Sequence, residues 1–215
     1  MSNILLHDYY RSSAAYRVRI ALNLKGVDYR SAPVNLLSSE QRNEAYRAIN
    51  PQGFVPALEV EGRILTQSLA IIGWLEATCP EPRLIPADPF DAAHVRAMAL
   101  LIACDVHPLN NLRVLKRLSA MEVDEESRNE WYRHWVKEGF TALEALAAPR
   151  AGRFLFGDSP TLADVCLVPQ MFNARRFDVD LEPFPILVAA DAEAKDLEPF
   201  AAAHPERVAP AQAQG

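Results

Sequence analysis

The sequence predicts an α/β domain followed by an all-α domain. Over residues 1–80, short apolar runs of strand type alternate with segments of helical spacing, whereas beyond residue 91 the spacing is helical throughout. Four prolines fall within a short span between the two parts, and such a span neither continues a helix nor occupies the centre of a sheet. We therefore expect an α/β domain at residues 1–80, a proline-rich linker at residues 81–90 and a helical domain at residues 91–215.

The first domain is expected to have the order β-α-β-α-β-β-α. Apolar runs of strand type and periodicities of three to four residues distinguish its strands from its helices. Glu61 and Gly62 form a turn between two short strands, which predicts an antiparallel hairpin. The expected strands are residues 4–9, 29–34, 57–60 and 63–65, and the expected helices are residues 12–26, 39–48 and one capped by Ser68.

The second domain is predicted to be helical by its apolar spacing. Val95, Met98, Ile102 and Val106 recur three or four residues apart, which predicts one long helix. Pro108 interrupts it, so we expect a kink just after His107. Residues 161–164, Thr-Leu-Ala-Asp, predict a capping box with Asp in the place of the usual Glu or Gln, opening an apolar helix.

Composition and charge exclude several classes of protein. The formal net charge is −6 and no basic block is present, so we expect no nucleic-acid partner. The longest apolar run, residues 97–104, is too short to cross a bilayer, and the N-terminus has no basic segment followed by an apolar stretch. We expect a cytoplasmic protein with no membrane partner.

The cysteines and histidines do not form a recognisable metal or redox motif. The three cysteines are far apart in apolar segments, with no CxxC pair, so we expect them to be reduced and buried. The five histidines show no HExxH or similar ligand spacing. We therefore predict no metal site.

Ser12 and Ser13 lie where the first strand runs into the first helix. A loop of this kind points backbone N–H groups and the positive end of a helix dipole at an anion. The alternative is that the two serines only cap the helix, which is the commoner role of serine in this position.

Two further features raise the case for a ligand site. Val55-Pro56 enters the hairpin as a candidate cis peptide, and the backbone beside it would be free to pair with an extended ligand. Gln67-Ser68 begins the next helix and offers an amide and N–H groups to a carboxylate. Each could also be an ordinary turn or cap.

With these motifs, nearly the whole chain resembles the zeta class of the glutathione transferases. The most specific motif is the run Ser-Ser-x-x-aromatic-Arg-Val-Arg at residues 12–19. Other motifs of the resemblance are Asn50-Pro51, Val55-Pro56, Gln67-Ser68, residues 107–111, residues 161–164 and residues 174–177. The resemblance implies a thioredoxin-like glutathione domain, a helical bundle on the side of the second substrate, and a homodimer.

The resemblance also implies a glutathione site and an activity. The implied chemistry is cis–trans isomerisation of maleylacetoacetate to fumarylacetoacetate, in tyrosine and phenylalanine degradation, by reversible addition of the glutathione thiolate. Ala14 and Ala15 stand where many relatives carry Cys, Thr or Ser, which leaves Ser12 as the main candidate for stabilising the sulfur. The implied glutathione-binding residues are Ser12, Ser13, Ala14, Gln52, Val55, Pro56, Gln67, Ser68, His107 and Asn111.

The implied substrate carries two carboxylates, so the site needs fixed cations. Arginine is suited to this because its guanidinium pairs with a carboxylate in two places and stays charged. The candidates for binding the substrate are Arg11, Arg113 and Arg176. Arg11 is also assigned, with Ser12 and Ser13, to the catalytic residues. Arg113 and Arg176 could instead lie on a solvated helix face. For Arg17 and Arg19 we expect structural roles within the helix.

Three alternatives to this activity remain open from the sequence. The first keeps the chemistry and exchanges the substrate for maleylpyruvate, from gentisate degradation. The second is a general glutathione transferase for other electrophiles. The third is a non-catalytic interaction scaffold, which the intact serines and arginines disfavour because a scaffold has no use for a thiol site.

Overall fold

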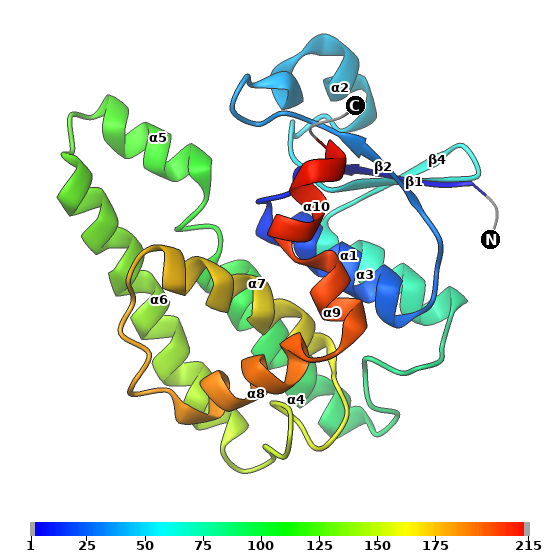
Figure 1. Ribbon diagram of the computed structural model, residues 1–215, viewed down its shortest axis with the longest axis vertical. Helices are drawn as coiled ribbons and strands as arrows, with labels where there is room; N and C mark the ends of the chain where they lie inside the picture. Colours follow the sequence, from blue (N-terminus) through cyan, green and yellow to red (C-terminus); the bar gives the residue numbers. More distant parts are fainter. Residues whose placement is uncertain (1–2, 213–215) are drawn as a thin grey trace. The chain divides into compact units, whose positions relative to one another are not determined.

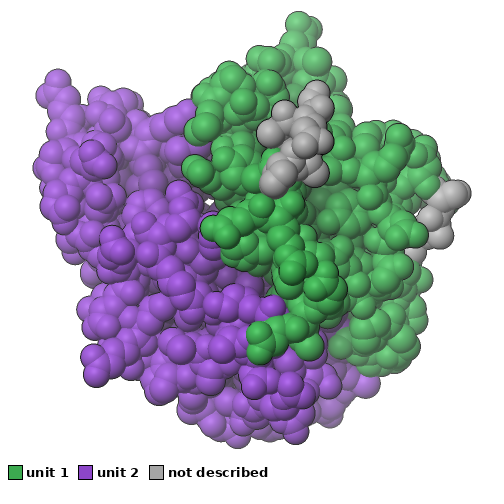
Figure 2. Space-filling model, in the orientation of Figure 1, with its two compact units in different colours: residues 1–83, 196–215 green, residues 84–195 purple. Residues whose placement is uncertain are grey.

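The chain forms two compact units, shown in different colours in Figure 2. The computed structural model describes residues 3–212, and for residues 210–212 only the backbone. One unit comprises Met1–Arg83 and Asp196–Gly215, and the other comprises Leu84–Lys195. This division differs from the expected one at the end of the chain, because residues after 195 group with the first unit and not with the helical domain.

The first unit is built on a four-stranded mixed sheet with the strand order β2-β1-β3-β4. β2 is parallel to β1, with Leu6 opposite Ser31, whereas β3 is antiparallel to β1 and to β4. Glu61 and Gly62 both have positive φ (51° and 73°), as the tight turn of the hairpin requires. The expected strands and hairpin are confirmed, with the bounds β1 Ile4–Asp8, β2 Arg30–Pro33, β3 Ala57–Val60 and β4 Arg63–Thr66.

Helices cover this sheet, and the chain returns to them at its end. α1 packs against α3 and also against α9, which follows the second unit in sequence (Figure 1). α9 buries Phe200 and Ala203 completely, which explains why the last residues belong to the first unit. The helices of this unit are α1 Ser13–Leu24, η1 Glu40–Arg42, α2 Glu44–Ile49, α3 Ser68–Thr78, α9 Glu198–Ala203 and α10 Pro205–Gln212.

Two helix starts in this unit differ from the prediction. The helix expected at residues 39–48 is divided at Asn43, whose extended backbone (φ −65°, ψ 150°) ends η1 and begins α2. Ser68 was expected to be an N-cap, but it is the first helical residue of α3. The cap is Gln67, with φ 70°, because β4 continues to Thr66 and leaves one residue for the turn.

The second unit is helical, which confirms the predicted class. A kink was expected after His107, but the helix ends there instead. Residues 101–106 form a π-helix, and the chain then turns at Pro108. The N–H of His107 accordingly donates to the carbonyl of Ile102, five residues back, at 2.9 Å. The helices are α4 Pro89–Leu100, η2 Leu101–Val106, α5 Leu112–Ala120, α6 Glu125–Ala147, α7 Leu162–Arg176 and α8 Pro185–Lys195.

The predicted capping box opens α7, the most buried helix of this unit. Asp164 Oδ2 accepts from the N–H of Thr161 at 2.7 Å and from its hydroxyl at 2.9 Å, and Oδ1 accepts from the N–H of Leu155 at 2.9 Å. Burial raises the pKa of Asp164 to about 6, although these hydrogen bonds oppose the shift. The box therefore also ties the preceding loop to the helix.

The three cysteines are free, but their burial differs from the prediction. Cys166 is buried, Cys79 is partly exposed and Cys104 is exposed, so only one of them fits the expected burial. Within residues 3–212, no group of three His, Cys, Asp or Glu side chains is placed to hold a metal ion. In the same part of the chain, no helix combines the length and the apolar character needed to span a membrane.

Candidate active site

Ser12 lies in the loop that leaves β1, directly before α1. Its backbone is extended (φ −70°, ψ 117°), and its N–H donates to the carbonyl of Tyr9 at 2.8 Å. Its Oγ accepts a hydrogen bond from the N–H of Ala15 at 3.3 Å. Ser12 is therefore the N-cap of α1, and its side chain is only half-buried.

Within residues 3–212, the Ser12 hydroxyl accepts this one hydrogen bond and donates none. A hydroxyl has one donor and two acceptor sites, and the cap uses one acceptor site. The first turn of α1 adds N–H groups and the positive end of its dipole at the same place. A thiolate beside Ser12 would receive both effects, and both lower the pKa of a thiol.

The residues around Ser12 differ in how accessible they are. Arg11 is exposed, and its guanidinium carbon lies 5.2 Å from the centre of the Tyr10 ring. Ala14 is half-buried in the first turn of α1, whereas Ser13 is only 7% exposed. Of the two predicted serines, Ser12 is thus the more accessible.

The loop before β3 contains the predicted Val55-Pro56 element, and its peptide bond is cis. Tyr46 and Asn50 hold this loop from α2, because the hydroxyl of Tyr46 and the amide of Asn50 both donate to the carbonyl of Phe54, at 2.7 and 2.8 Å. Burial raises the pKa of Tyr46, so its hydroxyl remains a donor at neutral pH. Among the described residues, no hydrogen bond engages the backbone of Val55, which leaves it available to an extended ligand.

Gln67 and Gln52 lie together at the N-terminus of α3. The Gln67 amide donates to Gln52 Oε1 at 2.7 Å, and both side chains are exposed. Ser68, the first residue of α3, is 6% exposed. The structure thus brings together the amides of Gln52 and Gln67 and the open N–H groups of a helix, a set of donors suited to a carboxylate.

Arg17 was assigned a local role, but it contacts this second helix terminus. It is 1% exposed, and its Nη1 lies 3.5 Å from the Oγ of Ser68, which is 51 residues away in sequence. A sequence signal for this burial exists, since Arg17 stands between the apolar residues Tyr16 and Val18, and both of these are buried. The buried guanidinium adds positive charge at the start of α3.

In the second unit, three predicted residues lie between the end of η2 and the first turn of α5. His107 is half-buried and ends η2. Asn111 is the N-cap of α5, and its Oδ1 accepts from the N–H of Arg113 at 3.1 Å. The side chain of Arg113 is exposed in the first turn of this helix.

Arg175 and Arg176, at the end of α7, have different surroundings. Arg175 donates to the buried carboxylate of Asp191 at 2.6 Å. The exposed guanidinium of Arg176 instead lies 5.7 and 5.8 Å from the ring centres of Phe172 and Phe177, and within residues 3–212 it forms no ion pair. Arg176 is therefore the one of the two that can receive an external carboxylate.

Family models match both halves of the chain. The model of the glutathione S-transferase N-terminal domain matches residues 6–83, and that of the C-terminal domain matches residues 127–203. The first match contains the loops of Ser12, Val55 and Gln67. The two matches together cover more than half of the chain.

Relatives and solved structures agree with these models. The chain is 50% identical to a maleylacetoacetate isomerase of Rhizobium meliloti, over 96% of this chain and 98% of the relative, and 48% identical to a maleylpyruvate isomerase of Ralstonia sp., over 93% and 96%. A holo structure of a maleyl pyruvate isomerase, described as a bacterial zeta-class glutathione S-transferase, is 46% identical with a TM-score of 0.92, covering 95% of this chain and 97% of that one. A maleylacetoacetate isomerase from Anaeromyxobacter dehalogenans 2CP-1, solved with GSH bound in its active site, is 46% identical with a TM-score of 0.86, covering 95% and 96%. The chain therefore belongs to the glutathione S-transferase family, in its zeta class.

Proposed function

We propose that the protein is a glutathione-dependent cis–trans isomerase that converts maleylacetoacetate to fumarylacetoacetate. The observation that carries the proposal is Ser12, an accessible hydroxyl at the start of α1 that donates no hydrogen bond to the described part of the chain. Relatives named maleylacetoacetate isomerase, at 50% and 45% identity in Rhizobium meliloti and Mus musculus, support this substrate. The place in tyrosine and phenylalanine degradation is proposed on the family resemblance.

The first unit has the donors that glutathione requires. When bound, glutathione supplies a thiolate that adds reversibly to the double bond beside the carbonyl, which permits rotation before the thiolate leaves. Ser12 donates to the sulfur and, with the N-terminus of α1, favours its ionised form. The backbone of Val55, which follows the Tyr46-held carbonyl of Phe54, pairs with the cysteinyl backbone of the tripeptide.

The glutamyl end of glutathione is assigned to Gln67 and Ser68. Its carboxylate meets the first N–H groups of α3, the amide of Gln67 and the positive charge of the buried Arg17. Gln52 orients the Gln67 amide through their 2.7 Å hydrogen bond. His107 and Asn111 are proposed as further glutathione contacts on the family resemblance alone.

Replacing Gln67 with Ala should weaken glutathione binding by about 1–3 kcal/mol, because a hydrogen bond to a charged group is lost. Calorimetric titration measures this directly. Arg63→Ala, an exposed change on the neighbouring strand β4, is the matched control and should leave the affinity unchanged. An unaltered affinity in Gln67→Ala would count against the assignment of the glutamyl end.

The carboxylates of the substrate are assigned to arginines. Arg11 stands directly before Ser12, and Arg113 and Arg176 are exposed in the second unit. Arg176 supports this assignment best, because Phe172 and Phe177 hold its guanidinium by cation–π contact without neutralising it.

Replacing Arg113 or Arg176 with Ala should weaken substrate binding by about 1.5–3 kcal/mol, which raises the KM roughly 10- to 100-fold. The titration of the bound thiol should stay where it is, because neither side chain is assigned to the sulfur. Steady-state kinetics and thiolate absorbance measure the two effects. Arg133→Ala controls for the loss of one positive charge, since Arg133 is already paired with Glu126 on α6. An unchanged KM in both variants would refute the arginine assignment.

Maleylpyruvate is the second candidate substrate. The Ralstonia relative and the TM-score of 0.92 to a maleyl pyruvate isomerase favour it specifically. Both substrates present a carbonyl beside a cis double bond and two carboxylates, so the same residues serve either. The ratio of kcat/KM for the two substrates decides between them.

The proposal includes the setting in which the enzyme works. We propose a homodimer in the cytoplasm, with a small dicarboxylate as its substrate and no nucleic-acid or membrane partner. The free state of all three cysteines supports a reducing compartment. Phe90, 87% exposed at the start of α4, supports burial of this helix by a second copy.

A further inference from the structure

Arg19 joins its own helix, α1, to two other segments of the first unit. Its Nη1 donates to both oxygens of Asp8 at 2.7 and 2.8 Å, its Nη2 to the carbonyl of Tyr10 at 2.9 Å, and its Nε to the carbonyl of Ala203 at 3.1 Å. The side chains of Arg19 and Asp8 are 1% and 0% exposed. A planar guanidinium donates in fixed directions, so these four hydrogen bonds fix the segments relative to one another.

One of these segments is the loop that carries Ser12. Tyr10 lies two residues before Ser12, and the N–H of Ser12 donates to Tyr9, the residue before Tyr10. The hydrogen bond from Arg19 therefore holds the loop between the end of β1 and the cap of α1. The position of the Ser12 hydroxyl depends on that span of backbone.

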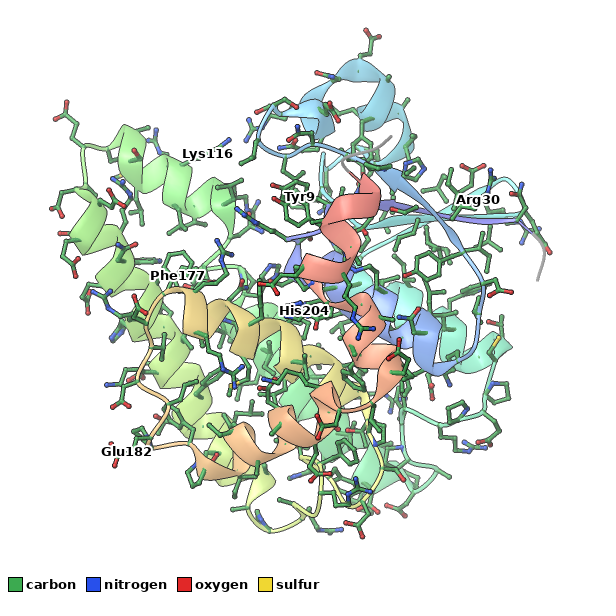
Figure 3. All side chains as sticks on the ribbon, viewed as in Figure 1. Tyr9, Arg30, Lys116, Phe177, Glu182 and His204 are labelled. Carbon is green, nitrogen blue, oxygen red and sulfur yellow. The ribbon has the colours of Figure 1, made fainter. Side chains whose placement is uncertain are left out.

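The second segment comes from the far end of the chain. Ala203 is the last residue of α9, so its carbonyl has no partner within the helix, and Arg19 supplies the missing donor. His204, labelled in Figure 3, packs edge-on against Tyr16, with 6.2 Å between the centres of the two rings. The guanidinium carbon of Arg19 lies 5.2 Å from the centre of the same Tyr16 ring. The end of α9 therefore contacts Arg19 directly, and His204 contacts it through the ring of Tyr16.

We infer that Arg19 is a positioning residue, through which the C-terminal segment at residues 196–209 holds the Ser12 loop in its working geometry. Lysine cannot replace it, because one ammonium group cannot reach Asp8 and two carbonyls in different directions. The inference rests on the proposed role of Ser12. It gives residues 196–209, which come after the second unit in sequence, a function at the glutathione site of the first unit.

The test is a double-mutant cycle between Arg19→Lys and Phe200→Ala, read by titrating the thiolate absorbance of bound glutathione. Phe200 is fully buried on α9, so its truncation should loosen the C-terminal segment while Arg19 and the residues of the Ser12 loop stay the same. Each single variant should raise the midpoint of the thiol titration by roughly half to one pH unit, with kcat at pH 7 reduced and the KM for the dicarboxylate nearly unchanged. The double variant should shift no further than Arg19→Lys alone, because both changes act through one contact.

Asn23→Ala is the matched control. Asn23 also joins α1 to the C-terminal segment, donating to the carbonyl of Pro199 at 2.9 Å, but it has no hydrogen bond to the Ser12 loop within residues 3–212. This variant should titrate like the wild type. Circular dichroism establishes that each variant is folded before it is titrated.

Ser12→Ala, measured beside these variants, separates the inference from the proposed function. A midpoint that shifts in Ser12→Ala but in neither Arg19→Lys nor Phe200→Ala overturns the inference alone. A shift in Arg19→Lys without one in Phe200→Ala overturns the part played by the C-terminal segment. A midpoint that shifts in none of the three overturns the role of Ser12, and the inference with it.

Discussion

Replacing Ser12 with Ala should raise the pKa of bound glutathione toward the ordinary thiol value of about 8.5 and reduce kcat at pH 7 by roughly 100-fold. The hydroxyl donor is lost, while the N-terminus of α1 remains and retains part of the stabilisation. Since the thiol ionises unaided as the pH rises, part of the lost activity should return above pH 8. Thiolate absorbance and a pH–rate profile measure the two effects.

Two variants sharpen this experiment. Ser12→Thr keeps the hydroxyl and can still cap α1, so it should retain most of the wild-type titration. Ser13→Ala removes the other hydroxyl of the predicted catalytic set, and because Ser13 is buried we expect it to shift the thiol titration far less than Ser12→Ala does. An unshifted midpoint in Ser12→Ala, or an equal shift in Ser13→Ala, would mean that another group stabilises the sulfur.

Replacing Asp164 with Ala should lower the free energy of unfolding by about 3–5 kcal/mol. The change leaves the buried N–H groups of Thr161 and Leu155 without their acceptor, and each such group costs about 1–3 kcal/mol. Denaturant unfolding measures the loss. Asp158→Ala, on the exposed loop before this helix, controls for removal of a carboxylate and should cost far less. A loss below about 1 kcal/mol in Asp164→Ala would contradict this account of the capping box.

The same carboxyl should give the stability a characteristic pH dependence. Folding raises the pKa of Asp164 from its ordinary value of 3.8 to about 6, so between these pH values the folded state holds the proton that the unfolded state has released. The stabilisation of the folded state by protonated Asp164 should therefore be fully present below about pH 4 and decline as the pH rises through 6. The free energy of unfolding of the wild type, relative to that of Asp164→Asn, should therefore fall by roughly 3 kcal/mol as the pH rises over this window.

Local patterns were sufficient to predict the individual strands, the hairpin and the capping box. Their signals are a turn at Glu61 and Gly62 between short apolar runs, and Thr161 followed three residues later by Asp164. Each of these elements is determined by residues close together in sequence, so its pattern can be recognised without knowledge of the tertiary structure.

Contacts between distant segments could not be predicted in the same way. Arg17 and Ser68 are 51 residues apart, and Arg19 and Ala203 are 184 residues apart. The apolar face of α9 indicates that it is buried, but spacing does not tell which surface covers it, and this is why residues after 195 were placed in the helical domain. The ion pair of Arg175 with Asp191 likewise joins two helices, and a helix pattern does not show which residues face each other across them.

The most direct measurement of the central claim is proton NMR of maleylacetoacetate incubated with the enzyme, with and without glutathione. Proton coupling across the double bond distinguishes the cis from the trans isomer, and the glutathione signals report whether it is consumed. We predict conversion to fumarylacetoacetate only when glutathione is present, with all of the glutathione recovered unchanged because the thiolate leaves after rotation. Conversion without glutathione, no conversion with it, or consumption of one glutathione for each substrate molecule would contradict a glutathione-dependent isomerase.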